Sequence, residues 1–220
     1  MAKRTPVVAL ATVLASIIVT LPAWSQSAKD AAPAELSARL KEAQGNPRQL
    51  EALVKTGRKV AAFCANCHGE GGNSLKPDIP NLAGQNPGYL LEQMRKFSVG
   101  ERRNEFMQRL IKVLSPDEKI GLVAFYANQE VLHKPSTNAA LRSQGQDYYG
   151  KICWRCHGEQ GRGNESFARV AGQQPDYLTL TLKRYRDGSS VRQDSMMSAN
   201  TKTMTDKDIA AVVAYVSSMK

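Results

Sequence analysis

The pentapeptides Cys64-Ala65-Asn66-Cys67-His68 and Cys153-Trp154-Arg155-Cys156-His157 both follow the pattern C-x-x-C-H. This pattern is the attachment signature of a c-type haem, in which two thiols bond to the haem vinyl groups and the adjacent imidazole ligates the iron. The spacing suits a helical turn, because cysteines three residues apart lie on nearly one side of it. All four cysteines of the chain fall inside the two motifs. The sequence therefore predicts two covalently bound haem c groups, attached at Cys64, Cys67, Cys153 and Cys156, with His68 and His157 as axial ligands.

Three other uses of paired cysteines are weaker. A zinc ribbon would use both pairs, but the pairs lie 89 residues apart, and a ribbon does not explain a histidine directly after each pair. A thioredoxin-like redox pair needs a βαβ pattern around the motif, which neither motif has. A disulfide within C-x-x-C closes a very short loop and stabilises little.

The N-terminus has the features of a secretory signal. Lys3 and Arg4 precede an apolar run from Val7 to Leu21, and small residues follow, which predicts cleavage after Ser25. An uncleaved anchor is the alternative, but the run is shorter than the roughly 20 residues that span a bilayer. Export agrees with the paired haem motifs, so the sequence predicts a periplasmic protein.

The chain is basic. Its net charge is +10, and loss of Lys3 and Arg4 with the signal peptide leaves +8. A modest basic surface suits an acidic redox protein or peripheral association with an anionic membrane surface; the alternative is that the charge only keeps the protein in solution. No basic run with interleaved aromatic residues is present, which argues against nucleic acid as a partner.

The two halves of the chain form an internal repeat. Each motif is followed by Gly-Glu, then by an Ala-Gly-Gln triplet (83–85 and 171–173) and a Pro-x-Tyr segment (87–89 and 175–177). Ser115 and Thr205 then each open a segment with acidic residues in its first turn and apolar residues at helical spacing, which predicts a C-terminal helix in each half. The expected division is a signal peptide (1–25), an extension with one helix (26–50), a first domain (51–134), a linker (135–141) and a second domain (142–220).

A sixth iron ligand must come from outside the two motifs. The chain has three histidines, so two bis-histidine haems are impossible. Counting back from the final helices, Met107 precedes Ser115 by eight residues and Met197 precedes Thr205 by eight. The repeat therefore selects Met107 and Met197 as axial ligands, with Met196 as the alternative to Met197. A His/Met pair gives a fully coordinated iron with a raised potential, which suits an electron carrier better than an enzyme.

Each axial histidine needs a hydrogen-bond acceptor that fixes its ring. The backbone carbonyls of Pro80 and of its counterpart Ala168 are the candidates. Four further side chains are candidates for contacts to the haem edge or propionates, with ordinary packing as the alternative: Tyr89, Tyr177, Arg102 and Arg192.

With these residues in hand, the chain resembles the dihaem class I cytochromes c of the cytochrome c4 type over residues 55–220. The resemblance rests on both C-x-x-C-H motifs, the Ala-Gly-Gln and Pro-x-Tyr segments, and the methionines before each last helix. It implies an all-α chain of two tandem class I cytochrome c domains, related by pseudo-twofold symmetry, with one covalent haem each and propionates near the domain interface. The first half departs from the pattern, because Gly57 lies one residue closer to its cysteine than Gly145 does and Val60 replaces the aromatic residue at Tyr149.

The expected function is non-enzymatic electron transfer between a membrane quinol-oxidising complex and a terminal oxidase or reductase. A cytochrome subunit of a flavocytochrome dehydrogenase, such as one that oxidises sulfide, is the first alternative. A dihaem peroxidase is the second, and it would need an open or switchable iron and a much longer chain.

Overall fold

The computed structural model describes residue 1, residues 33–135 and residues 138–220. The predicted signal peptide and the start of the extension lie outside the described residues, as do positions 136 and 137 of the linker. Within the described part the chain is helical, and its only β-pairing is an isolated antiparallel bridge between Arg102 and Arg192. No helix in these ranges combines the length and the apolar character needed to cross a bilayer.

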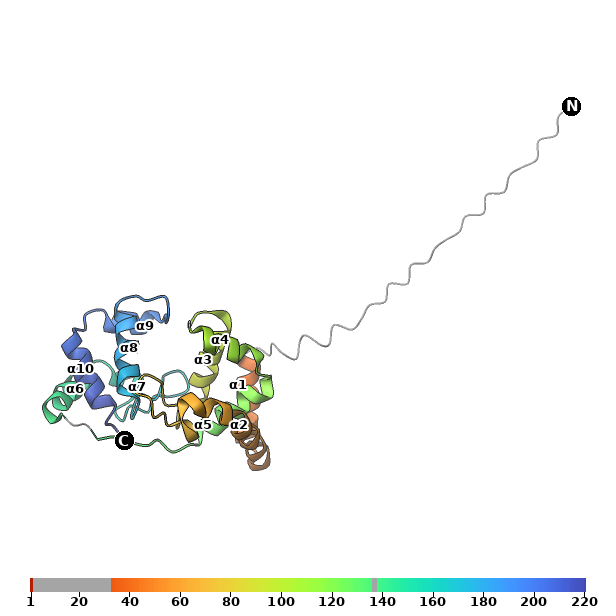
Figure 1. Ribbon diagram of the computed structural model, residues 1–220, viewed down its shortest axis with the longest axis horizontal. Coiled ribbons are helices and arrows are strands. Elements are labelled where there is room, and N and C mark those ends of the chain that lie inside the picture. The colour runs from red at the N-terminus through yellow and green to blue at the C-terminus, as the bar shows by residue number, and fades with distance from the viewer. Residues whose placement is uncertain (2–32, 136–137) are drawn as a thin grey trace.

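The helices form two groups (Figure 1), which we call the first unit and the second unit. The first unit contains α1 (Pro33–Gln44), α2 (Pro47–His68), the 3₁₀ turn η2 (Glu70–Gly72), α3 (Pro87–Val99), α4 (Glu105–Val113) and α5 (Pro116–Ala127). The second contains α6 (Ala139–Lys151), α7 (Trp154–His157), α8 (Pro175–Arg186), α9 (Ser195–Thr201) and α10 (Asp206–Val216). Each unit has its own hydrophobic core.

The helices begin where the sequence supplies capping groups. Ser115 and Thr205 each form a capping box, with Glu118 and Asp208 respectively, at the start of the two C-terminal helices. Asn46 caps α2 through its side chain, and Pro47 occupies the first turn. Because α2 starts at Pro47, the expected boundary between residues 50 and 51 falls inside a helix.

The N-terminal extension packs into the core of the first unit. Leu36 and Leu40 of α1 are buried, with exposures of 7 % and 3 %, in the same cluster as Ile120 and Val123 of α5. Burial of two leucine side chains contributes on the order of 3–6 kcal/mol. Helix α1 therefore belongs to the first unit and stabilises it.

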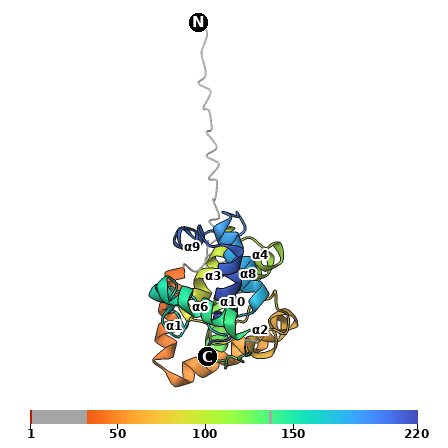
Figure 2. The ribbon, with the colours of Figure 1, turned by 90° about the vertical axis from the view of Figure 1, so that its left-hand side faces the viewer.

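The terminal helices cross in the same way in both units, and Figure 2 shows α6 and α10 nearest the viewer. A Cβ at Gly57 would lie 1.9 Å from the Gly121 carbonyl oxygen of α5, and a Cβ at Gly145 would lie 1.9 Å from the Ala211 oxygen of α10. Gly57 is thus equivalent to Gly145 despite its different spacing. Helix α2 runs unbroken into the first motif, whereas α6 ends at Lys151 and α7 begins at Trp154, and this break absorbs the additional residue.

The unit interface is built from the two Ala-Gly-Gln turns. Gly84 and Gly172 have φ values of 60° and 71°, a backbone conformation that favours glycine. Gly84 N donates to Tyr126 O at 2.9 Å and Gly172 N donates to Val216 O at 3.0 Å, so each turn sits at the end of its own C-terminal helix. Val131, from the connection between the units, is buried against both glycines. The two turns therefore face each other across one side chain.

Candidate functional site

The two motif histidines are held by backbone carbonyls. His68 Nδ1 lies 2.8 Å from Pro80 O, and His157 Nδ1 lies 2.9 Å from Ala168 O. Both carbonyls are the ones predicted from the sequence, and this prediction is confirmed. Burial lowers the pKa of both imidazoles, and the carbonyl bonds only partly offset that effect. Each ring is therefore kept neutral and oriented, with Nε2 available as a ligand.

The four motif cysteines are partly buried. Burial raises the pKa of the Cys64 thiol, and it raises the pKa of Cys153 to about 11. Neither thiol is therefore a thiolate at neutral pH, unlike a reactive redox cysteine, whose pKa is lowered. This environment suits thiols that bond to an apolar group.

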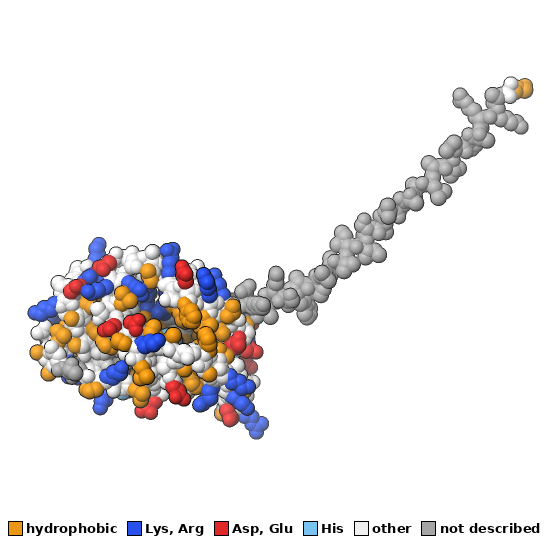
Figure 3. Space-filling view, viewed as in Figure 1, with side chains coloured by type: hydrophobic (Ala, Val, Ile, Leu, Met, Phe, Trp, Pro, Cys, Tyr) orange, Lys and Arg blue, Asp and Glu red, His pale blue; other side chains and the backbone are white. Residues whose placement is uncertain are grey.

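One continuous cavity of about 670 Å³ is lined by both motifs. Its walls are largely apolar side chains from α2 to α5 and from α6 to α10. Figure 3 shows hydrophobic side chains gathered around the hollow on this face. The Tyr126 hydroxyl lines the first half of the cavity, buried near Cys64 with no hydrogen-bond partner of acceptable geometry. A large, apolar, planar group attached at the cysteines would fill this space.

Met107 and Met197 line the cavity in equivalent positions. The Asn104 side chain caps α4 by accepting from Met107 N at 3.0 Å, and the Asp194 side chain caps α9 by accepting from Met197 N at 3.1 Å. Met196 also lines the cavity, but it is half exposed, and its sulfur lies 3.9 Å from the Cys156 sulfur. The structural counterpart of Met107 is therefore Met197.

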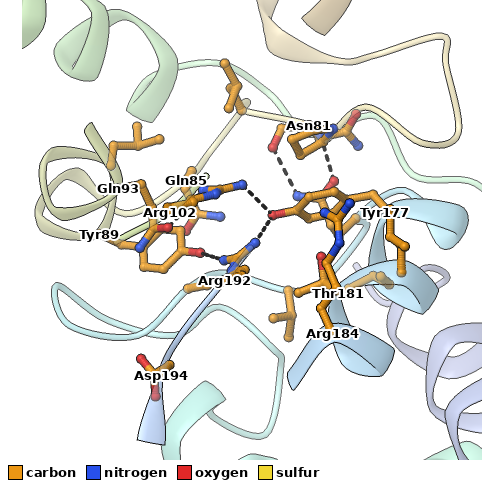
Figure 4. A pocket seen from close by; sticks show the side chains of 18 of the residues that line it. Asn81, Gln85, Tyr89, Gln93, Arg102, Tyr177, Thr181, Arg184, Arg192 and Asp194 are labelled. Atoms are coloured by element: carbon orange, nitrogen blue, oxygen red, sulfur yellow. Dashed lines mark hydrogen bonds between the residues drawn. The ribbon is translucent and has the colours of Figure 1, made fainter. Parts of the chain in front are cut away.

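A cluster of arginines and tyrosines spans the two units inside the cavity (Figure 4). Arg192 of the second unit donates to Tyr89 of the first at 2.5 Å, to Tyr185 at 2.6 Å, and to Tyr177. Arg102 of the first unit donates to Tyr177 of the second at 3.1 Å. The four sequence candidates are thus brought together, and the cluster joins the units.

The cluster carries an excess of positive charge. Arg192 is buried at 8 % exposure, and within the described residues neither Arg102 nor Arg192 forms an ion pair with a carboxylate. Burial alone would raise the pKa of Tyr177, but the two guanidinium groups outweigh it and bring that pKa to about 7. A partly ionised tyrosine balances only part of the charge of two guanidinium groups, and a buried cation that is not fully balanced is unfavourable. The site therefore fits a ligand that brings its own carboxylates, as the haem propionates would.

Sequence reasoning missed several polar residues of this site. Tyr185 occupies the position equivalent to Phe97, so Arg192 gains a hydroxyl partner where Arg102 lies over a ring at 4.5 Å. The sequence identifies Gln85 and Gln173 only as matching positions of the internal repeat, without a role. Their roles depend on contacts between residues more than 80 positions apart, which no local pattern reveals.

Comparisons with known proteins agree with this geometry. The sequence profile of the Cytochrome c family matches residues 143–220. A cytochrome c4 from Thiocapsa roseopersicina is 34% identical over 188 residues, covering 78% of this chain and 92% of its own. The chain belongs to the cytochrome c4 family.

Another relative and a solved structure agree with this assignment. The crystal structure of reduced cytochrome c4 from Pseudomonas stutzeri matches with a TM-score of 0.70 and 28% identity, over 76% of this chain and 98% of that one. A thiosulfate dehydrogenase electron acceptor from Thiomonas intermedia is 31% identical, over 71% of this chain and 78% of its own. The predicted all-α cytochrome c fold, the two haems and the role as an electron carrier rather than an enzyme are confirmed.

Proposed function

We propose that this cytochrome c4 homologue is a periplasmic dihaem shuttle that carries electrons from a membrane quinol-oxidising complex to a terminal oxidase or reductase. The observation that carries the proposal is the matched histidine and methionine setting at both ends of one cavity. Two haems in one chain suit a protein that accepts electrons at one surface and donates them at another. The predicted N-terminal signal supports export.

The ligand assignment is part of the proposal. Cys64 and Cys67 would attach the first haem and Cys153 and Cys156 the second. The axial pairs would be His68 with Met107 and His157 with Met197. The support is the equivalence of the caps before each methionine and of the carbonyls behind each histidine.

When bound, the two haems supply reversible one-electron exchange between ferric and ferrous iron. The protein's own residues set the conditions for that exchange. The apolar walls exclude water, which disfavours the more charged ferric state. Arg102 and Arg192 would hold the propionates where the units meet, and the tyrosine hydroxyls fix both guanidinium groups. Holding the imidazoles by rigid backbone carbonyls limits structural change on electron transfer.

A second candidate donor is a thiosulfate dehydrogenase. Two relatives, from Thiomonas intermedia and from Stutzerimonas stutzeri, carry the name thiosulfate dehydrogenase electron acceptor. In this case the chain would accept electrons from that dehydrogenase and pass them to a terminal oxidase. A flavocytochrome subunit differs from both in copurifying with a flavoprotein.

The test of the ligand assignment is the absorption spectrum of the ferric protein. A methionine–iron bond is expected to give a weak absorption band at about 695 nm. The intensity of this band in the wild-type protein should correspond to two methionine-ligated haems. Met107→Ala and Met197→Ala should each remove about half of the wild-type band and create one carbon monoxide site. Met196→Ala is the matched control and should leave the band intact. A wild-type protein with fewer than two covalent haems, or one that binds carbon monoxide at rest, would refute the assignment.

The direction of transfer is tested with the exported protein. N-terminal sequencing of the secreted product should begin at Gln26. The reduced protein should then be oxidised by membranes that contain a terminal oxidase, and it should not turn over peroxide. Rapid reduction by a thiosulfate dehydrogenase with thiosulfate, but not by a quinol-oxidising complex, would favour the second candidate.

A further inference from the structure

Two buried glutamines reach from each unit into the other. Gln173 of the second unit accepts from Asn81 N at 2.7 Å and donates to Asn81 O at 3.0 Å. Gln85 of the first unit accepts from Arg169 N at 2.7 Å and donates to Arg169 O at 2.9 Å. Both side chains are nearly inaccessible to solvent, at 8 % and 6 % exposure. The contacts are reciprocal, so each unit clamps one loop of its neighbour.

Each clamped amide belongs to the peptide unit that holds a haem histidine. The Asn81 N–H and the Pro80 C=O are the two ends of a single peptide group, and Pro80 O is the acceptor for His68. In the second unit, the Arg169 N–H and the Ala168 C=O are likewise one peptide group, and Ala168 O is the acceptor for His157. A continuous chain of hydrogen bonds therefore runs from a glutamine in one unit, through one peptide, to the axial histidine of the other.

We propose that Gln173 and Gln85 are positioning residues for electron transfer, each setting the redox potential of the haem in the opposite unit. The inference rests on the proposed function, because it takes His68 and His157 as axial ligands. Apart from one bond accepted from the N–H of the next residue, each glutamine side chain forms its hydrogen bonds across the interface. The fold of the Ala-Gly-Gln turn does not itself require those bonds, so they are available for the role proposed here.

The direction of the effect follows from polarisation. A peptide whose N–H is bound to a strong acceptor places more negative charge on its carbonyl oxygen, because hydrogen bonds in a chain reinforce one another. That oxygen then draws the histidine Nδ1 proton more strongly and makes the imidazole a more basic ligand. A basic ligand stabilises ferric iron. Removing the glutamine acceptor should therefore raise the potential of the opposite haem.

The two clamped residues are not equally supported by contacts of their own side chains, although Asn86 Nδ2 of the first unit also donates to Phe167 O in the second loop, at 2.9 Å. The Asn81 side chain donates to Gly172 O at 2.9 Å and accepts from Ser74 N at 2.8 Å, and Pro80 precedes it. Arg169 has one further side-chain bond of its own, from Nε to Ala171 O at 3.3 Å, and Ala168 lacks the ring of proline. Loss of Gln85 should therefore move the second haem further than loss of Gln173 moves the first.

The experiment uses full-length holoprotein with Gln173→Met or Gln85→Met, which keep side-chain length but remove the amide. Each change is made in Met107→His and Met197→His backgrounds, where the bis-histidine haem titrates separately at lower potential. Gln173→Met should raise the potential of the first haem and change its ferrous-to-ferric ratio several-fold at fixed ambient potential, with the second unmoved. Gln85→Met should do the reverse. Gln173→Glu, which keeps the acceptor oxygen, should not raise the first potential.

The control separates tuning from simple loosening of the interface. Glu165→Ala removes a contact between the units, from Gly88 N at 2.7 Å, without touching either histidine-bearing peptide, and it should move neither potential. The inference is overturned if a glutamine variant shifts both haems equally, shifts the haem of its own unit, or lowers thermal stability with no change in potential. Failure of the proposed function is seen separately, because the parent protein would then lack two methionine-ligated haems in its ferric spectrum.

Discussion

Replacing Gly145 by alanine tests whether close contact of α6 and α10 stabilises the second unit. The added Cβ would lie 1.9 Å from Ala211 O and 2.8 Å from Tyr215 Cβ. The backbones of α6 and α10 are in direct contact here. The two helices would therefore have to separate by roughly 1.5 Å before the new Cβ reached an ordinary contact distance. Overpacking of this kind costs up to about 3 kcal/mol, and the better helix propensity of alanine returns about 1 kcal/mol. The net destabilisation is about 2 kcal/mol.

The assay is thermal unfolding of the ferric holoprotein followed by circular dichroism at the helical band. For a domain of this size, about 2 kcal/mol corresponds to a midpoint lower by roughly 8–16 °C. Gly150→Ala is the matched control, because Gly150 lies in the same helix with nothing within 4 Å of its Cβ position; its midpoint should rise by a few degrees. If Gly145→Ala melts at or above the temperature of Gly150→Ala, the packing argument is wrong.

Three other changes have defined outcomes. Leu40→Ala should destabilise the first unit by about 2–5 kcal/mol, measured as a lower unfolding midpoint with an unchanged haem spectrum, whereas Leu75→Ala, at a 90 % exposed site, should have no effect. Tyr177→Phe removes the oxygen that accepts from both arginines and should cost about 1–3 kcal/mol; an unchanged midpoint would contradict a structural role for the cluster. Burial lowers the pKa of His68 and His157 in the folded chain, and ligation to iron would also keep both rings unprotonated. Unfolding therefore takes up protons, and the unfolding midpoint should fall as pH drops below about 6.5. A midpoint that stays constant between pH 7 and 5 would contradict this.

The features that the sequence predicts correctly depend mostly on interactions between residues close together in the chain. The C-x-x-C-H motifs need only five residues each, and the capping groups at Ser115 and Thr205 act within one helical turn. Counting back from those caps is enough to align Met107 with Met197, because the methionine lies eight residues before the capping residue in both halves. Pro80 and Ala168 align instead by their place before the Ala-Gly-Gln triplets, since each precedes its triplet by three residues.

Long-range packing explains what the sequence did not predict. The clamps at Gln85 and Gln173 pair positions that lie in different halves, and no periodic pattern specifies which amide meets which peptide. Helix α1 had no assigned role because its leucines could face any core. Gly57 is displaced by one residue when counted from Cys64, but its position is determined by its contact with Gly121 on the opposite helix.

The reciprocal glutamine contacts are those that two identical chains make when they pair about a twofold axis. A single copy of the repeat could thus have associated with itself before the two were fused into one polypeptide. Fusion removes the dependence of such pairing on protein concentration and frees each copy to change alone. The two halves differ in this way at two places: Phe97 lies beside one arginine and Tyr185 beside the other, and Pro80 lies behind one histidine and Ala168 behind the other. A self-pairing chain has the same residue on both sides and cannot carry such differences.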